Sequence, residues 1–356
     1  MTDKAAGLPR RAPTATLMSM IDLPQAGPAP VRITSEWTRQ DRLGAVRCRL
    51  GGFRNRYRVV PGLHALGNPG PEAPVCVSAN YKLSYDLLRR ALHGMDAWIL
   101  VLDTKGINVW CAAGKGTFGT DEIVARIASA RLAARVSHRE IIVPQLGAPG
   151  VEAHVVERQS GFRVRFGPVR AADLPAYLAA GRQATPEMRR VRFDLADRAV
   201  LVPLEIRGTI GPWFAFALFA LIYAAVSRRG IRIDTAWAGG WPLLALGAGA
   251  ALAGAVLTPL LLPFIPGRAF TFKGWLVGAA VTAALLHGAG LAGRMDPWLI
   301  AASYAFFPAA AGLAAQQFTG ASTLTSLSGV RKEIRISLWF LLVAAAVTAA
   351  GLVVSK

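Results

Sequence analysis

The chain divides into a first part, where short apolar runs alternate with charged segments, and a second part of long apolar runs. Five apolar stretches of 17 to 22 residues follow Arg207. They are residues 210–226, 241–262, 274–292, 297–315 and 337–354. At a rise of about 1.5 Å per residue, helices of these lengths cross the hydrocarbon core of a bilayer. The pattern predicts an all-α transmembrane domain of about five helices over residues 210–356.

Before residue 210, the apolar runs have the lengths of strands and amphipathic helices. The expected strands are residues 74–78, 97–103, 140–143 and 161–166, and the expected helices are 83–93 and 120–136. The first helix carries Leu83, Leu87, Leu88, Ala91 and Leu92 on one face, and Thr120 is the expected N-cap of the second. Strand, helix and strand within about 30 residues indicate a parallel unit. We therefore expect a doubly wound, Rossmann-like α/β domain over residues 31–209, with residues 31–60 as a peripheral layer.

Composition supports this division. Hydrophobic residues make up 53% of the 356 residues and charged residues only 17%, against about 25% charged in soluble domains. This excludes a disordered chain, a coiled coil and an ordinary soluble monomer. The net charge is +19, of which +12 belongs to residues 1–209. We expect no nucleic-acid binding, because basic residues flank the spans and no nucleic-acid motif is present. The basic α/β domain could instead attract an acidic protein partner.

The charges that flank the spans favour one orientation. Seven basic residues lie on the side of the α/β domain and five on the opposite side, which places that domain in the cytoplasm by the positive-inside rule. The basic cluster at residues 228–232 argues the other way. The expected location is the inner, cytoplasmic membrane, with several spans. Residues 1–30 are rich in Pro and Ala, are not a cleavable signal, and are expected to form a mobile tail.

Few side chains suggest chemistry outside the α/β domain. His287 is the only titratable group well inside a span, and a neutral imidazole hydrogen-bonded between helices is the simplest interpretation. Gly274 and Gly278 would permit close helix packing.

The three cysteines, Cys48, Cys76 and Cys111, form no CxxC pair, so the chain is expected to bind no iron–sulfur cluster or structural zinc by itself.

Residues 104–120, TKGINVWCAAGKGTFGT, follow the strand at 97–103, where ligands bind in such folds. They do not form a Walker A loop, because Val109 stands in place of its first glycine and Gly116 in place of its hydroxyl residue. No histidine has a familiar spacing to Cys111 as a nucleophile. Taken alone, a cysteine on a short helix is most simply a small core residue.

The segment Asn108–Lys115, NVWCAAGK, resembles the cap-helix motif of the HgcA family of mercury-methylating corrinoid proteins. Residues 78–84 (SANYKLS), 97–108 and 144–151 (PQLGAPGV) are similar to that family as well. With the layout of an α/β domain followed by membrane helices, the resemblance covers most of residues 35–356. A related pattern occurs in the large subunit of the corrinoid iron–sulfur protein, whose cluster-binding cysteines are absent here.

The resemblance implies a corrinoid (cobalamin) that lies across the strand ends with its nucleotide tail displaced from the cobalt. Cys111 would be the catalytic residue and the lower axial thiolate ligand of the cobalt. Asn108 would cap the helix or reach the ring edge, and Trp110 would pack under the ring or fill the core. Lys115 would add positive charge or only end the helix. Gly114 and Gly116 would leave room for the macrocycle, and further cofactor contacts are expected from Thr104, Gly106, Val109, Ala112 and Ala113.

The implied activity is a membrane-anchored methyltransferase that transfers a methyl group from cobalt to Hg(II), forming methylmercury. Because this chain has no redox centre to reduce the cobalt between cycles, the resemblance implies a ferredoxin-like partner with two [4Fe–4S] clusters. The methyl donor would be a donor protein or a methyl-tetrahydrofolate pathway. Two alternatives stay open: a corrinoid methyl carrier with another acceptor, and a non-catalytic cobalamin-binding membrane protein.

Overall fold

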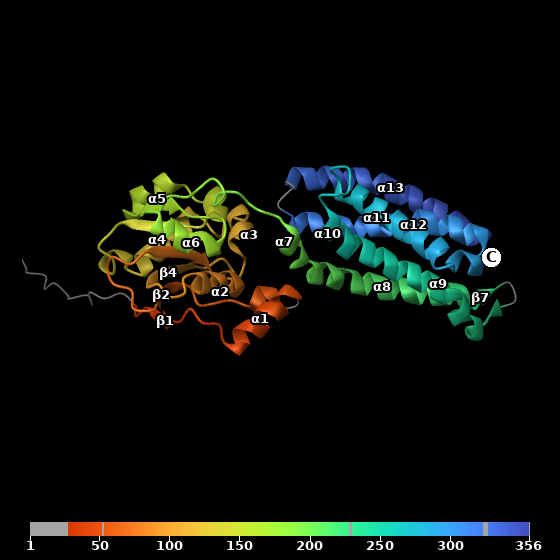
Figure 1. The fold of residues 1–356 in the computed structure, drawn as a ribbon, viewed down its shortest axis with the longest axis horizontal. Coiled ribbons are helices and arrows are strands. Elements are labelled where there is room, and N and C mark those ends of the chain that lie inside the picture. Colours follow the sequence, from red (N-terminus) through yellow and green to blue (C-terminus); the bar gives the residue numbers. More distant parts are fainter. Residues whose placement is uncertain (1–27, 52, 228–229, 323–326, 356) are drawn as a thin grey trace, which may run out of the picture.

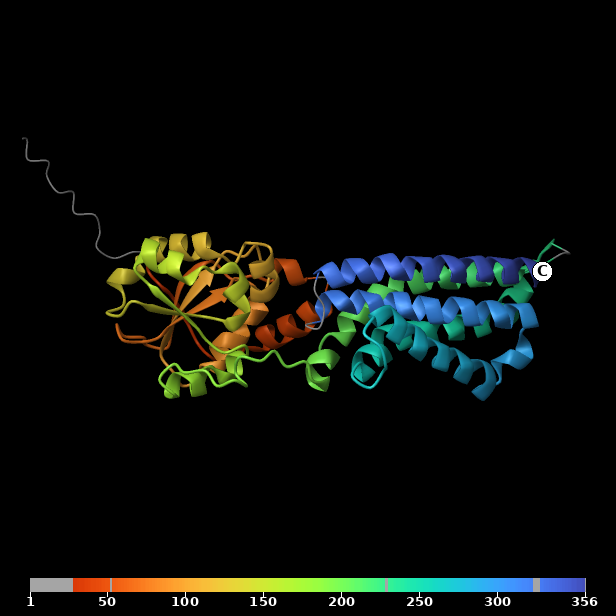
Figure 2. The ribbon, with the colours of Figure 1, turned by 90° about the horizontal axis from the view of Figure 1, so that it is seen from above.

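The structure is a computed structural model that describes residues 28–51, 53–227, 230–322 and 327–355. Figure 1 shows an α/β domain and a helical bundle arranged end to end, with the chain passing between them once. Seen from above, the same two bodies form an elongated molecule (Figure 2). All but the last three residues of the expected tail, 1–30, lie outside the described residues.

A six-stranded sheet forms the centre of the α/β domain, with strand order β1-β2-β4-β3-β5-β6. The strands are β1 Val31–Ile33, β2 Gly62–Leu66, β3 Val75–Ala79, β4 Ala97–Leu102, β5 Glu140–Val143 and β6 Arg163–Phe166. The four expected strands are confirmed. The sheet is mixed, because β2 runs antiparallel to β4 while the other neighbours are parallel. The strands β3 and β4 are buried along their whole length, as continuous apolar runs predict.

Helices cover both faces of this sheet (Figures 1 and 2). They are α1 Arg39–Arg49, α2 Lys82–Ala91, α3 Val109–Gly114, α4 Thr120–Ser129, α5 Ala153–Ser160 and α6 Leu174–Ala179. The helix expected over 120–136 ends at Ser129, because Arg131 adopts a left-handed conformation with φ 47°. Its N-cap is Gly119 rather than Thr120, whose hydroxyl accepts a hydrogen bond from the backbone of Glu152.

The peripheral layer expected over residues 31–60 contains a helix, α1, that the alternating pattern did not predict. Thr38 and Asp41 form a capping box at its start. Asp41 also joins α1 to α2, since it pairs with Lys82 at 2.5 Å and with Arg89 at 2.7 Å. Both cations pair in turn with the fully buried Asp86. This four-membered ion-pair network fixes α1 against the domain.

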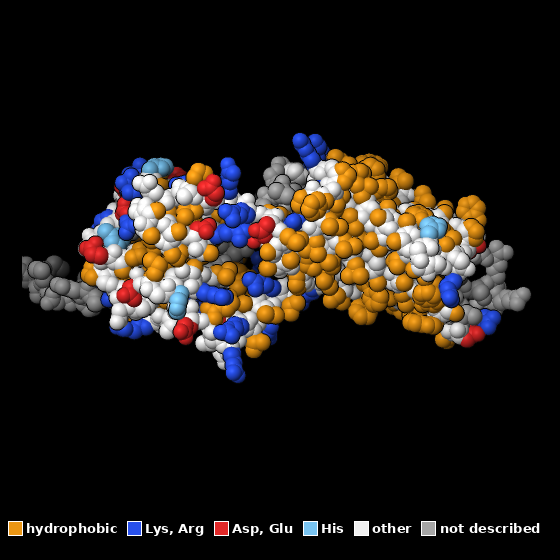
Figure 3. All heavy atoms as spheres, in the orientation of Figure 1, with side chains coloured by type: hydrophobic (Ala, Val, Ile, Leu, Met, Phe, Trp, Pro, Cys, Tyr) orange, Lys and Arg blue, Asp and Glu red, His pale blue; other side chains and the backbone are white. Residues whose placement is uncertain are grey.

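Five helical segments in the described residues are long and apolar enough to cross a membrane, as expected. They are Leu195–Ala225, Ala236–Leu261, Phe270–Gly288, Pro297–Gly320 and Gly329–Val354. They are built from α8 Val202–Ala225, α9 Ile233–Leu252, α11 Phe270–Ala283, α12 Pro297–Gln317 and α13 Leu327–Val354, with the short helices α7 Leu195–Ala199 and α10 Thr258–Leu261. The bundle surface in Figure 3 is largely apolar.

The span bounds differ from the expected ones at several ends. The second span begins at Ala236 rather than at residue 241, the third begins at Phe270 rather than at residue 274, and the fourth ends at Gly320 rather than at residue 315. The first and last helices begin well before residues 210 and 337, because charged residues continue each helix beyond its apolar part. The third ends at Gly288 rather than at residue 292, since Gly290 has a left-handed φ of 72°. Arg228 and Arg229, from the basic cluster that opposed the favoured orientation, lie outside the described residues.

Small residues and one polar pair join the central helices of the bundle. A Cβ on Gly274 would lie 2.8 Å from the carbonyl oxygen of Ala311, and one on Gly278 would lie 3.0 Å from the Cα of Pro308. Both glycines are therefore needed for the close approach of α11 to α12, as their spacing predicted. The ring of His287 makes a hydrogen bond of 2.9 Å to the hydroxyl of Tyr304 on α12. This is the expected bond between helices.

Candidate functional site

A cavity of about 880 Å³ lies at the carboxyl ends of the central strands. The chain moves outward from β3 to β4 on one side and from β5 to β6 on the other, so the strand order reverses between β3 and β5. These two strands pair through Cys76 and Ile142, and both residues line the cavity. Open α/β sheets bind their ligands at such a switch point. The fold thus places the cavity where the sequence predicted a site.

One wall of the cavity is the apolar face of α2. Leu83, Leu87, Leu88 and Ala91 line it, and the side chain of Leu87 remains 41% exposed. Hence the apolar face of α2 that the sequence predicted does not lie wholly in the core. The buried residues of α2 are Leu83, Tyr85, Asp86 and Arg89. The leucine face thus lies partly in the core and partly along the cavity, to which it gives an apolar wall.

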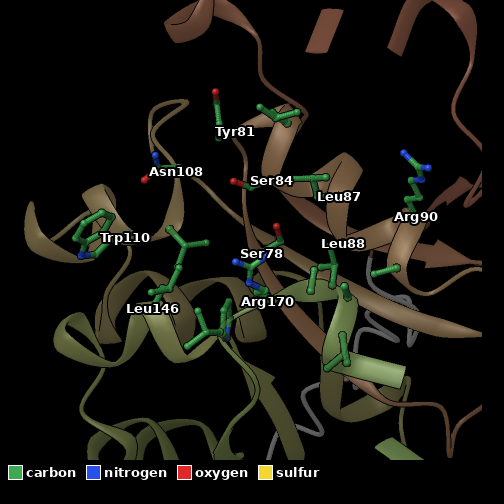
Figure 4. A pocket seen from close by; sticks show the side chains of 18 of the residues that line it. Ser78, Tyr81, Ser84, Leu87, Leu88, Arg90, Asn108, Trp110, Leu146 and Arg170 are labelled. Carbon is green, nitrogen blue, oxygen red and sulfur yellow. The ribbon is translucent and has the colours of Figure 1, made fainter. Parts of the chain in front are cut away.

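Polar groups enter the same cavity at a few positions. Ser78 follows the middle of β3, and Tyr81 and Ser84 stand at the start of α2; Figure 4 shows these side chains around the opening. Four arginines also line it: Arg49, Arg54, Arg90 and Arg170. None of these seven residues was predicted from the sequence to be a ligand. The serines and Tyr81 lie in the SANYKLS segment, so the resemblance of that segment was the available signal.

The predicted cap helix is α3, at the rim of the cavity. The side chain of Asn108 accepts a 2.9 Å hydrogen bond from the backbone N–H of Cys111, which is the N-cap role. Val109, Ala112 and Ala113 are buried beneath the helix. Trp110 is 39% exposed and lines the cavity, and Cys111 is exposed. The core interpretations of Trp110 and Cys111 were therefore wrong.

A buried asparagine holds the loop that leads into α3. The Asn80 side-chain oxygen accepts bonds from the backbone N–H of Thr104 and Gly106, at 3.1 and 2.9 Å, and from the Thr104 hydroxyl at 2.9 Å. The Asn80 amide donates to Asp103 at 3.1 Å. Thr104 and Gly106 are buried and do not line the cavity. They hold the loop before α3. Of the other residues expected to contact the cofactor, Asn108, Val109 and Trp110 line the cavity, and the following do not: Cys111, Ala112, Ala113, Gly114, Lys115 and Gly116.

The segment PQLGAPGV supports α3 from below. It contains a 3₁₀-helix, Gln145–Gly150, that packs against α3. A Cβ on Gly147 would lie 2.5 Å from the ring of Phe118. One on Gly150 would press on the carbonyl of Phe118 and lie 3.1 Å from the Cα of Ala113. Both glycines are therefore required for this close packing.

The outer side of α3 leaves space for a bulky ligand. Gly114, Lys115 and Gly116 are exposed, and a Cβ added to either glycine would meet no protein atom within 4 Å. Gly116 also has a φ of 79°, which glycine adopts without strain. The face of α3 over Gly114 and Gly116 is therefore open to solvent, as is Cys111.

The other two thiols differ from that of Cys111. Cys76 is buried in the cavity wall, where burial raises the pKa of its thiol to about 12. The sulfur of Cys48 lies 2.8 Å from the hydroxyl of Tyr81, and this bond is buried. Of the three cysteines, only Cys111 offers an exposed sulfur.

The comparisons agree with a corrinoid-protein class for the α/β domain. Residues 53–178 match the family model described as CO dehydrogenase/acetyl-CoA synthase delta subunit, a family of corrinoid proteins. Residues 53–178 are therefore similar to that family. The match covers the sheet from β2 to β6, the cap helix and the loop beneath it.

Curated relatives are described as gamma rather than delta subunits of such a complex. Acetyl-CoA decarbonylase/synthase complex subunit gamma is 31% identical over 127 residues in Archaeoglobus fulgidus and 30% identical over 127 residues in Methanopyrus kandleri. Each alignment covers 35% of this chain and 27% of the relative. The chain thus spans about a quarter of the length of these relatives, and its five membrane-type helices lie outside the matched region.

Proposed function

We propose that this chain is a membrane-anchored, corrinoid-dependent methyltransferase whose methyl acceptor is Hg(II). The observation that supports it best is the cap helix α3, whose residues Asn108, Val109 and Trp110 line the switch-point cavity and whose Cys111 is exposed. The relationship of residues 53–178 to corrinoid proteins supports the cofactor. The NVWCAAGK motif, together with the membrane helices, supports the mercury assignment.

The residues that line the cavity between α2 and α3 would hold the corrinoid. When bound, the corrinoid supplies a cobalt centre for methyl transfer. Cys111 would hold the lower face of the cofactor, with its nucleotide tail displaced to leave that position free. Asn108 keeps the first turn of α3 formed, and Gly114 and Gly116 keep its outer face clear. The apolar wall of α2 excludes water from the opposite side.

Asn80 and the 3₁₀-helix Gln145–Gly150 hold the thiol in place. A ligand to a cofactor must keep its position while the cofactor reacts, so the backbone that carries it is best fixed on both sides. Asn80 fixes the loop before α3, and Gly150 allows the support below it. These residues act through α3 and are positioning residues in our proposal.

A methyl acceptor other than Hg(II) is the second candidate, because of the complex in which the relatives are named as subunits. They are named as subunits of an acetyl-CoA decarbonylase/synthase complex. A corrinoid methyl carrier that serves another acceptor would use the same cavity and the same thiol. Production of methylmercury from Hg(II) by the reconstituted protein decides between the two.

The decisive test begins with optical spectra of the purified full chain reconstituted with cobalamin. We expect a thiolate–cobalt signature in the wild type, loss of that signature in Cys111→Ala, and retention in Cys48→Ala, which removes a buried thiol of the same cavity. Methylmercury formation should likewise be lost in Cys111→Ala and retained in Cys48→Ala. Identical spectra for wild type and Cys111→Ala would remove the ligand role of this cysteine.

The proposed reducing partner is a ferredoxin-like protein with two [4Fe–4S] clusters. Residues 1–209 carry a net charge of +12, so we expect the α/β part to bind an acidic face of that partner. Attraction between exposed charges falls as salt screens them. The affinity of the pair should therefore drop between low and physiological ionic strength, measured by titration in detergent or nanodiscs. Constant affinity over that range would exclude an electrostatic docking mode.

A further inference from the structure

The outer face of α1 carries an apolar stripe that no part of the described structure covers. Leu43, Val46 and Leu50 are 64%, 56% and 47% exposed. They follow one another at intervals of three and four residues, so they lie along one side of the helix. The opposite side, with Gly44, Ala45 and Cys48, packs into the domain. A helix whose inner face is already packed thus presents a second apolar surface to its surroundings.

Basic side chains border this stripe. Residues 39–58 contain seven arginines and one acid, Asp41. Asp41 is occupied by its ion pairs with Lys82 and Arg89. Arg39, Arg42 and Arg47 are exposed on α1, and Arg47 stacks over the ring of Phe53. Figure 3 shows Lys and Arg gathered on the side of the α/β domain that faces the bundle.

Two contacts place the end of α1 where the chain enters the bundle. The guanidinium of Arg207 donates a 3.1 Å hydrogen bond to the carbonyl of Leu50. A Cβ on Gly51 would lie 2.5 Å from the side chain of Leu204, so the two segments touch. Leu204 and Arg207 belong to the first turns of α8, directly before its apolar part. A basic residue at this position marks the level of the lipid headgroups. The stripe of α1 therefore ends at that level.

We propose that α1 is an interfacial helix, which seats Leu43, Val46 and Leu50 at the boundary between headgroups and acyl chains and its arginines among the phosphates of an anionic leaflet. An exposed apolar stripe bordered by arginines is the pattern of helices that lie in a membrane surface. The occupant is lipid rather than a protein because the stripe is continuous with a membrane-spanning helix through Leu204 and Arg207. A separate protein would have to displace lipid there.

This docking also bears on the cavity. Cys48 and Arg49 of α1 line the cavity wall. An α1 helix held by lipid fixes that wall relative to the bilayer. The α/β domain would then sit on the membrane in one orientation, rather than swing on the segment before α7.

The test places a nitroxide on α1 in the full chain and measures its environment. In a Cys111→Ala background, the remaining native thiols, Cys48 and Cys76, are buried. We compare a label attached at Val46→Cys with a matched control, a label at the exposed polar position Gln40→Cys. The protein is reconstituted in bilayers of phosphatidylcholine alone or with phosphatidylglycerol. Collisions with oxygen, which partitions into lipid, are compared with collisions with a water-soluble nickel chelate.

We expect the label at position 46 to report lipid in the anionic bilayers, while the label at position 40 stays water-accessible. Removing two arginines with Arg42→Gln and Arg47→Gln should weaken docking by about 30-fold, from about 1 kcal/mol per charge, and shift the transition to higher anionic lipid content. A position-46 label that stays in water in both bilayers overturns the proposal. So does a label that leaves water only when a partner protein is added. None of these readings requires bound corrinoid, so they are independent of the proposed function.

Discussion

The size of single side chains decides both the packing beneath α3 and the open space on its outer side. Gly114 and Gly150 are close in the fold and have opposite requirements. Gly150 has no room for a Cβ because Phe118 and Ala113 lie against it, whereas Gly114 faces open space. A structural requirement explains the first glycine. The second has open space beside it, which is what the proposed corrinoid would require.

This difference gives a paired prediction. Gly114→Ala should leave the thermal stability of the corrinoid-free protein unchanged and weaken corrinoid binding by about tenfold, the effect of a clash costing about 1.4 kcal/mol. Gly150→Ala should lower stability by about 1–3 kcal/mol, because the packing beneath α3 cannot accept a methyl group. Thermal melts and cobalamin titrations of both variants check this. Equal corrinoid affinity in Gly114→Ala and wild type would place the macrocycle elsewhere.

At the scale of whole elements, buried strands were the most predictable feature and short helices the least. Continuous apolar runs specify β3, β4 and β5, since strands buried on both faces need nothing else. The helix α1 was not predicted because its apolar residues Leu43, Val46 and Leu50 lie on its exposed side, while a charged residue, Asp41, is buried. An argument from periodicity assumes that apolar residues face the core and charged residues face solvent. The network that buries Asp41 joins residues 41 apart in sequence, which no local pattern records.

The network around Asp41 predicts acid sensitivity of the α1–α2 contact. Burial raises the pKa of Asp41, but hydrogen bonds from Lys82, Thr38 and Arg89 outweigh it and lower the pKa far below the ordinary value of 3.8. A carboxylate with a lowered folded-state pKa contributes its full stability above the unfolded value, and that contribution is lost as pH falls below it. The free energy of unfolding of the α/β domain should therefore decrease as the pH drops below about 4.

Two variants isolate this contribution. Asp41→Asn should lose about 3 kcal/mol at pH 7, since it breaks a buried ion pair, and its stability should then depend less on pH below 4. Glu36→Gln, which changes an exposed carboxylate just before α1, should behave like wild type in both respects. Denaturation followed by near-ultraviolet circular dichroism measures both. The same acid loss in Asp41→Asn as in wild type would assign the sensitivity to other carboxylates.

At the scale of the molecule, the cavity depends on both domains. Val200, Leu201 and Leu204, at the entry to the bundle, line it together with the sheet and α2. Arg170, also on the cavity wall, pairs with Asp197 of α7 across the same junction. The sequence allowed the two domains and the cap motif to be predicted separately. It could not show that the first membrane helix contributes a wall, because that depends on how two bodies meet.

The charges that flank the spans predict on which side of the membrane this shared cavity opens. An impermeant maleimide tests it in cells that lack corrinoid, where no cobalt occupies the thiol, because Cys111 is exposed while Cys48 and Cys76 are buried. With the α/β domain in the cytoplasm, the reagent should label the protein in inverted membrane vesicles and leave it unlabelled in intact cells. Cys111→Ala should stay unlabelled in both. Labelling in intact cells would place the domain outside, where neither a cytoplasmic ferredoxin-like protein nor a methyl-tetrahydrofolate pathway could reach the thiol, and the proposed function would fail with the topology.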